Sequence, residues 1–155
     1  MDNTREAFEN YSFAVVEKLF EEAKGDLSTL TSDEQEVVRI WRLEADMYNG
    51  GFIQFFCNWG YDNYVATLQV LNKLKAEKSL AIITESEQLI AKAKDDPQVK
   101  EYWDIPKVLS NYLNDVEMKR LDALDELYWD NPDDIQQLAY LVYLDASGKG
   151  VVDEV

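Results

Sequence analysis

The chain has 155 residues, of which 46% are hydrophobic and 12% aromatic, so it can bury a core as one domain. Its 31 acidic and 15 basic residues give a net charge of −16, which disfavours binding to nucleic acid or anionic membranes and attracts basic proteins. Because the chain has no histidine and one cysteine, Ser-His-Asp catalysis, an intrachain disulfide and most zinc sites are excluded.

Hydrophobic residues recur every three or four positions from the N-terminus onward, which predicts helices. Asn3 and Glu6 have the spacing of a capping box, and Gly25 is expected to close the first helix. Thr31 and Glu34 repeat the capping pattern at the start of a second helix.

The middle of the chain continues the helical pattern. The pair Asn49-Gly50 is expected to end the second helix in a left-handed C-cap, and Asp62 or Asn63 is expected to cap the next one. A further helix is expected over residues 80–93, before the turn sequence Asp95-Asp96-Pro97.

Helical spacing also dominates the last third. Pro106 suits a first helical turn, and one long apolar stripe follows over residues 108–127. Asn131-Pro132 is expected to start a last helix that Gly148 ends, with residues 146–155 as a mobile tail. We therefore predict an all-α fold, a single compact domain of six to eight helices spanning residues 1–155.

Residues 48–60 read YNGGFIQFFCNWG, and this stretch is expected to be structural. Its glycines permit a tight turn between two helices, whereas no phosphate-binding glycine pattern is present. The aromatic residues that follow share the i, i+3, i+4, i+7 spacing of one helical face, which is more typical of a core than of a cofactor site. The predicted structural motif comprises Asn49, Gly50, Gly51, Phe52, Phe55, Phe56 and Trp59. Cys57 lacks a histidine base and is expected to be buried and inert.

The negative charge is concentrated in the last two-fifths of the chain, where residues 95–155 contain fifteen acidic and five basic residues, a net charge of −10. Helical neighbours three or four positions apart could place carboxylates in a row, with spacings approaching the roughly 7 Å between phosphates of one DNA strand. The predicted partner-binding residues are Asp115, Asp122, Asp125, Glu126, Asp130, Asp133 and Asp134. Asp133 and Asp134 would also stabilise a helix N-terminus, and a merely solvated acidic face is the simpler alternative.

The acidic composition also allows other interpretations. Carboxylate pairs could serve a glycosidase, but pairs are inevitable in so acidic a chain. The turn at residues 130–134 lacks the ligand spacing and glycine of an EF-hand, so no metal and no cofactor are expected. The main rival is a helical interaction domain that uses an apolar surface, formed by Tyr128, Trp129 and Tyr140, with the charge serving only solubility.

The stretch from Met47 to Gly60 resembles the signature of a bacterial family of small acidic proteins, catalogued mainly as a domain of unknown function. One member of that family is described as a DNA-mimic protein. Glu44, Asp46 and the segment 121–128 also fit the family pattern, and the likeness spans residues 35–145. The resemblance implies an all-helical fold and is compatible with a homodimer. In the DNA-mimic member, a carboxylate surface imitates duplex phosphates and engages a DNA-binding protein such as a transcription factor.

Together these observations predict a non-enzymatic acidic protein that binds a basic partner protein, with mimicry of DNA phosphates as the sharpest form of the hypothesis. No basic region followed by an apolar segment marks the N-terminus as a signal peptide, and no apolar run approaches 18 residues. With the single cysteine, this favours a cytoplasmic location.

Overall fold

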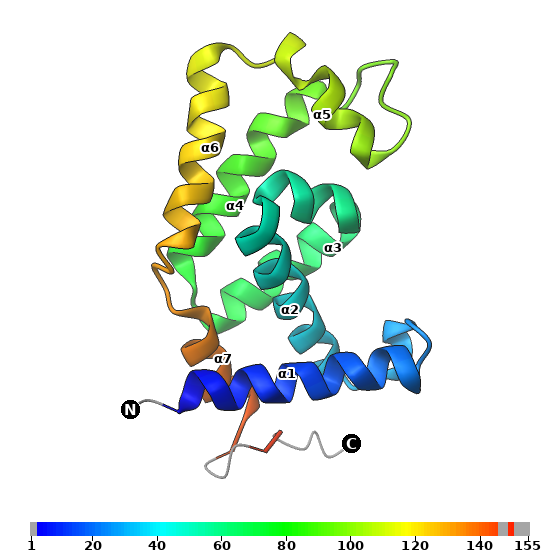
Figure 1. Ribbon diagram of the computed structural model, residues 1–155, viewed down its shortest axis with the longest axis vertical. Coiled ribbons are helices and arrows are strands. Elements are labelled where there is room, and N and C mark those ends of the chain that lie inside the picture. The colour runs from blue at the N-terminus through cyan, green and yellow to red at the C-terminus, as the bar shows by residue number, and fades with distance from the viewer. Residues whose placement is uncertain (1–2, 146–148, 151–155) are drawn as a thin grey trace.

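The computed structural model describes residues 3–145 and 149–150, and this part of the chain folds into seven α-helices without a strand (Figure 1). The all-α prediction of six to eight helices is confirmed. The α-helices are α1 (Thr4–Glu21), α2 (Ser32–Gly50), α3 (Phe52–Leu74), α4 (Glu77–Ile90), α5 (Ile105–Val108), α6 (Asp115–Trp129) and α7 (Ile135–Tyr143). Short 3₁₀ helices lie at η1 (Leu27–Thr29), η2 (Ala91–Ala93), η3 (Tyr102–Asp104) and η4 (Leu109–Asn111).

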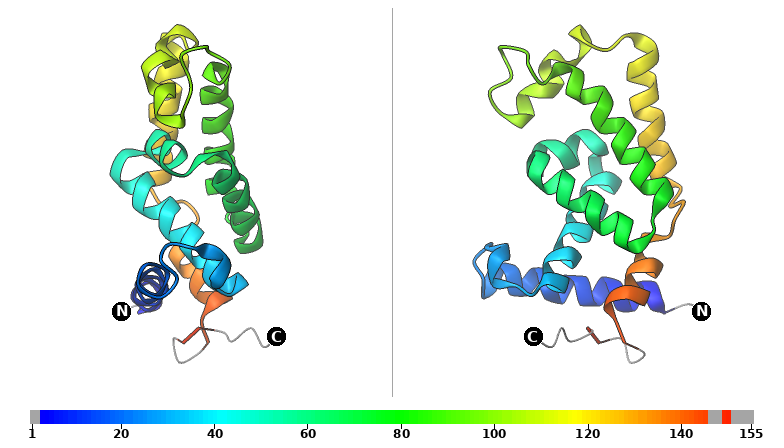
Figure 2. Two further views of the ribbon diagram at one scale, coloured as in Figure 1. Left: turned by 90° about the vertical axis from the view of Figure 1, so that its right-hand side faces the viewer. Right: turned by 180° about the vertical axis from the view of Figure 1, so that it is seen from behind.

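The helices form an elongated assembly around the α2–α3 pair. α2 packs against α3 at the centre, and α4 and α6 pack against each other along one edge (Figure 1). α1 packs against α7 at one end, and the segment that contains α5 lies at the opposite end (Figure 2). Among the described residues, no helix combines the length and the apolar character that crossing a membrane requires.

The two capping boxes predicted for the N-terminal half differ in outcome. At the start of α2 the box is confirmed: the Glu34 amide donates to the Thr31 hydroxyl at 3.1 Å, and the Thr31 amide donates to the Glu34 carboxylate at 3.0 Å. The box at Asn3 and Glu6 is wrong, since the Asn3 side chain caps nothing. Asn3 has φ −91° and ψ 1°, whereas an N-cap side chain reaches the first turn from an extended backbone.

Two glycines, Gly51 and Gly60, change the direction of the chain before and within α3. Neither lies at the position where the sequence predicted a helix end or a cap. α2 continues through Gly50, and it is Gly51 that leaves the helix, with φ 84° and ψ −167°. Gly60 has φ 85° and ψ −177° inside α3, so this helix bends there instead of starting anew at a cap. The predictions of a C-cap at Asn49-Gly50 and of a cap at Asp62 or Asn63 are therefore wrong, because only glycine adopts such dihedral angles without strain.

The segment 108–127 is not one continuous helix as the apolar stripe predicted. Pro106 does lie in the first turn of α5, but α5 ends at Val108, η4 ends at Asn111, and α6 begins after Asn114. Asn114 forms an unpredicted capping box with Glu117, with hydrogen bonds of 2.8 and 3.1 Å. Leu109 and Leu113 before the break and Leu121 after it are buried in the same core, whereas Val116, in the first turn of α6, is exposed.

The last helix starts later than predicted. α7 begins at Ile135 and not at Pro132, because Asn131 and Asp134 both have positive φ and form a turn between α6 and α7. α7 ends at Tyr143, and Gly148, the predicted terminator, lies outside the described residues. So does most of the predicted mobile tail, but Gly150 forms an antiparallel bridge with Leu144 and packs against the Tyr11 side chain.

Candidate partner-binding surface

The acidic side chains of α6 are divided between its inner and outer sides. Leu121, Leu124 and Tyr128 are buried and hold the inner side against the rest of the protein. At about 100° per residue, Asp115, Asp122 and Glu126 lie within about 40° of one another on the opposite, outer side. Asp130, the residue that follows α6, lies one further turn along the same side. We call these four exposed residues the outer row: Asp115, Asp122, Glu126 and Asp130.

The carboxylates of the outer row are exposed and free to bind another molecule. None of its four carboxylates accepts a hydrogen bond or forms an ion pair within the described part of the chain. Lys119 lies on the same side of α6, between Asp115 and Asp122, and divides the row. From Asp122 to Asp130 no basic residue intervenes, so the negative charge is most concentrated at the C-terminal end of α6.

Asp125, in contrast, faces inward and connects α6 to the start of α3. Its carboxylate accepts a hydrogen bond of 2.9 Å from the Phe52 amide. Burial raises the pKa of Asp125, the Phe52 amide lowers it, and the neighbouring charge of Asp122 raises it again. Since the helix N-terminus at Phe52 would otherwise have an unsatisfied amide, Asp125 has a structural role.

Asp133 and Asp134 are also engaged within the chain. The Asp133 carboxylate accepts a hydrogen bond of 2.6 Å from the Ser79 amide in the first turn of α4. Asp134 accepts hydrogen bonds of 3.0 and 3.1 Å from the Arg5 guanidinium on α1. The structure therefore brings four of the seven predicted residues together in the outer row and places the other three at contacts between helices.

The residues of the predicted structural motif divide into an apolar and a polar side. Phe52, Phe55 and Phe56 are buried, and the rings of Phe52 and Phe56 stack with centroids 5.8 Å apart. On the polar side, the Trp59 indole donates to the Asp46 carboxylate at 2.7 Å, and Gln54 donates to it at 2.8 Å. Asp46 is nearly buried, so these donors compensate the desolvation of its charge.

Asn49, Gly50 and Gly51 form the junction ahead of these rings. The side-chain amide of Asn49 donates to the side-chain oxygen of Gln54 at 3.2 Å across the junction. A side chain at Gly51 would place its Cβ 2.1 Å from the Asp125 carboxylate, and one at Gly50 would meet the Gln54 side chain. The junction thus connects three helices: α2, α3 and α6.

The apolar surface proposed as the rival site does not form as predicted. Tyr128 is 1% exposed, and its hydroxyl donates to Glu44 in the interior, so its assignment to a surface is wrong. Trp129 is 45% exposed, although its indole nitrogen donates to the Met47 carbonyl at 2.6 Å. Tyr140 is half-buried against the core. The three residues therefore do not share one exposed patch.

A family model for DMP19-like proteins matches residues 28–147, which is more than half of the chain. The chain belongs to the DMP19-like family. No curated protein and no solved structure matches it. The matched region covers the helices α2 to α7, and so includes both the α2–α3 junction and the outer row of this DMP19-like chain.

Cys57 of the DMP19-like chain is buried, and its thiol contacts the Tyr102 carbonyl oxygen at 3.2 Å. Burial raises the pKa of the thiol to about 11. Because the thiolate is the nucleophilic form, the environment of Cys57 suppresses its reactivity at neutral pH. Within the described residues, no group of three or more His, Cys, Asp or Glu side chains could hold a metal ion.

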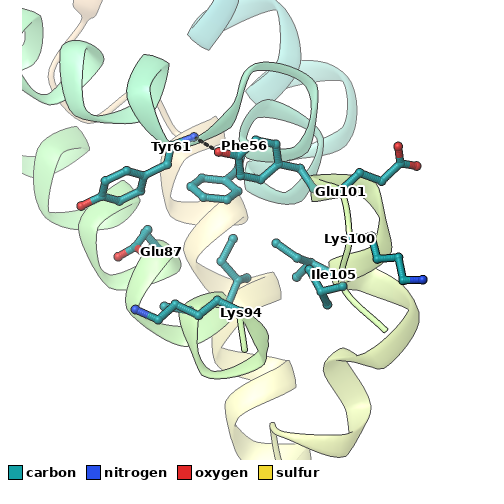
Figure 3. Close-up of a pocket in the computed structure, with 11 residues that line it drawn as sticks. Phe56, Tyr61, Glu87, Lys94, Lys100, Glu101 and Ile105 are labelled. Carbon is teal, nitrogen blue, oxygen red and sulfur yellow. Dashed lines mark hydrogen bonds between the residues drawn. The ribbon is translucent and has the colours of Figure 1, made fainter. Parts of the chain in front are cut away.

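A cavity of about 650 Å³ lies between α3, α4 and the segment leading into α5 (Figure 3). Phe56 and Ile105 face its centre, and the Tyr61 amide donates to the Tyr102 hydroxyl at 3.2 Å at its upper wall (Figure 3). The ammonium groups of Lys94 and Lys100 point away from each other at opposite sides (Figure 3). The volume suits a small organic molecule, but the polar groups do not converge on one point.

Sequence reasoning missed the environment of Glu44, which it used only as part of the family pattern. Burial raises the pKa of Glu44 to about 7; the Tyr128 hydrogen bond lowers the pKa, and the nearby charge of Asp134 raises it. Tyr128 lies 84 positions away in the chain, so no local pattern could have revealed this pair. Glu44 also lines a second cavity in the DMP19-like chain, together with Trp41 and Tyr48.

Proposed function

We propose that this DMP19-like chain is a non-enzymatic binding protein, and that the outer row on α6 captures a basic protein partner. In its sharpest form, the row imitates the phosphates of a DNA strand and occupies the cationic surface of a nucleic-acid-binding protein, such as a transcription regulator. The cytoplasm is the compartment we propose for this activity.

The observation that carries this proposal is the arrangement of Asp122, Glu126 and Asp130 on the outer side of α6. One helical turn separates each from the next, which is about 6 Å along the axis. With the side chains splayed, that spacing approaches the roughly 7 Å between successive phosphates, which follow a rise of about 3.4 Å per nucleotide in each strand. The carboxylates have no intramolecular partner among the described residues, so binding a cationic surface breaks no contact that holds the fold.

The charge of the whole chain supports the same function. A net charge of −16 exceeds the magnitude of about 2–8 that solubility asks of a small domain. A field of this strength steers a cationic partner toward the protein and makes the association rate dependent on salt. Membership of the DMP19-like family agrees with this function, since the family resemblance includes a member described as a DNA mimic.

The direct test compares two triple variants that remove the same charge from different surfaces. One variant, Asp122→Asn with Glu126→Gln and Asp130→Asn, neutralises the three residues at the C-terminal end of the outer row. The control, Glu17→Gln with Glu21→Gln and Glu22→Gln, neutralises three exposed residues on and after α1. Each protein is immobilised and exposed to purified basic DNA-binding proteins at low and high salt.

We expect wild type and the control to retain these proteins at low salt and to release them at high salt, while the outer-row variant retains little. Duplex DNA should release the captured proteins, because it competes for the same cationic surface. Equal retention by the two variants would remove the outer row from the proposal. Retention that is insensitive to salt would show that capture relies on apolar contacts and not on the charge of the outer row.

A further inference from the structure

A cavity of about 220 Å³ lies where α1 and α2 meet the first turn of α7. Its lining includes four aromatic residues, Phe8, Phe13, Trp41 and Tyr48, and two acidic residues, Glu9 and Glu44. Phe13 is 52% exposed and Tyr48 is 47% exposed, so the aromatic part of the lining is reachable from solvent. Aromatic faces and carboxylates together are the chemistry that binds organic cations in proteins.

The acidic lining distinguishes this cavity from the other two described cavities. The largest one is lined by Lys94 and Lys100 as well as by acidic residues, and the third is lined by Arg39 and Lys73. The 220 Å³ cavity is lined by no lysine and no arginine. Of the three cavities, it is therefore the one whose charged lining residues are all acidic.

Glu44 makes the cavity a stronger site than a surface carboxylate would. Within the described residues it has one hydrogen-bond partner, the Tyr128 hydroxyl, which leaves acceptor capacity on its carboxylate. Desolvation strengthens the attraction of this carboxylate for a cation, because the surroundings screen the charge less than water does. The positive charge of Arg5 on α1 also influences Tyr48, but the Arg5 guanidinium donates hydrogen bonds to the Asp134 carboxylate.

The cavity adjoins the acidic end of α6. The Tyr48 ring contacts the Tyr128 ring with centroids 5.6 Å apart, which connects the cavity wall to the last turn of α6. Gln136 in the cavity lining follows Asp130 by six positions across the turn between α6 and α7. The cavity therefore lies near the C-terminal end of α6, on the side of the buried Tyr128, and the outer row ends on the other side of the same helical turn.

We infer that the cavity binds an arginine side chain of the basic partner, with the guanidinium between the Trp41 and Tyr48 rings and the Glu44 carboxylate. This inference rests on the proposed function for the identity of the partner. Arginine fits better than lysine, because its planar guanidinium is more weakly hydrated, stacks on aromatic rings and presents paired donors to a carboxylate. The outer row supplies long-range attraction, and the cavity supplies a fixed point of attachment.

The test titrates the full chain with the peptide acetyl-Gly-Arg-Gly-amide at pH 8, where Glu44 with its pKa of about 7 is ionised. The citrulline counterpart of the peptide keeps the shape but lacks the charge. Binding is followed through the indole NMR signal of Trp41, assigned with a Trp41→Phe variant. We expect the arginine peptide to shift this signal in a saturable way, and the citrulline peptide to leave it unchanged.

Two variants locate the site. Glu44→Gln keeps the size of the side chain and should weaken the arginine peptide about tenfold, since a charge-assisted hydrogen bond is replaced by a neutral one. Tyr48→Leu should weaken it several-fold through loss of the ring. Glu17→Gln on α1, away from the cavity lining, is the matched control and should bind as wild type. Equal binding of the citrulline peptide, or unchanged binding by Glu44→Gln, would overturn the inference, as would tighter binding of the corresponding lysine peptide.

The outer-row triple variant separates this inference from the proposed function. It should bind the arginine peptide as wild type does while losing its capture of basic proteins. If capture depends on the outer row but the peptide does not bind, the cavity assignment fails and the proposed function stands. If the peptide binds but capture does not depend on the row, the cavity assignment stands and the proposed function fails.

Discussion

The Asp125 carboxylate on α6 accepts a hydrogen bond of 2.9 Å from the backbone amide of Phe52, the first residue of α3, although 73 positions separate the two residues. The contact provides the N-terminus of α3 with a cap from another helix, where its own N-cap residue, Gly51, has no side chain. The carboxylate thus links α6 to α3, while the buried Leu121, Leu124 and Tyr128 pack α6 against α4 and α2 and leave the outer row facing away.

Replacing Asp125 by alanine should destabilise the fold by about 1–3 kcal/mol, because the Phe52 amide then has no acceptor. Asp122→Ala, three residues earlier on the outer side of the same helix, is the matched control and should change the stability by no more than about 0.5 kcal/mol. Urea denaturation followed by circular dichroism measures both. Equal losses would mean that the Phe52 contact contributes nothing to stability.

Replacing Gly51 by alanine should cost about 2–3 kcal/mol, since its backbone has a positive φ and the new Cβ would lie 2.1 Å from the Asp125 carboxylate. Gly25 offers a close control: its φ is also 84°, but nothing lies within 4 Å of the position of a Cβ. The cost of Gly51→Ala should therefore exceed that of Gly25→Ala in thermal or urea unfolding. If the two costs were the same, backbone strain alone would account for both.

Glu44 should make stability fall as pH rises. Burial raises its pKa from 4.5 to about 7, so the folded state holds this proton more tightly than the unfolded state does. The contribution is fully present below pH 4.5 and is lost as the pH rises through about 7, at a cost on the order of 3 kcal/mol. The titratable and charged groups that surround Glu44 and Tyr48 include Tyr48 itself, Tyr128, Asp134 and Arg5. All four are the same in wild type and in a Glu44→Gln variant.

Glu44→Gln removes the titrating group but keeps an acceptor for the Tyr128 hydroxyl. We expect this variant to be more stable than wild type at pH 8 and to match it near pH 4.5. Paired urea titrations at the two pH values give the difference directly. A constant gap between the proteins at both pH values would show that Glu44 ionises in the folded protein as it does in the unfolded chain.

Cys57 should react slowly with iodoacetamide in the folded protein. At pH 8 a thiol with a pKa of about 11 is ionised in about one molecule in a thousand, and burial restricts access as well. Labelling followed by mass spectrometry should show rapid modification after unfolding in urea and little before it. Fast labelling of the folded chain would place the thiol in an open environment.

Local patterns predicted the helices well, because the interactions that define them span three or four residues. The Thr31–Glu34 capping box is such a case, and so is the proline in the first turn of α5. The same pattern failed at Asn3, where the backbone conformation does not let the side chain reach the first turn. A residue pattern therefore indicates where a cap is possible, while the surrounding chain decides whether it forms.

The candidate surface was predictable only in part, since the roles of its carboxylates depend on distant residues. Spacing along α6 places Asp122 and Glu126 on one side, and the structure leaves them exposed. Nothing near Asp133 in the sequence indicates its contact with Ser79, which lies 54 positions earlier. The cavity beside Glu44 combines residues of three helices and has no sequence signature at all.

The acidic residues on the two sides of α6 differ in what a substitution would change. Asp125 on the inner side contacts the first residue of α3, whereas the carboxylates on the outer side make no hydrogen bond or ion pair among the described residues. Under the proposed function, designed sequences on the outer side of α6 would therefore change the choice of basic partner without weakening the fold.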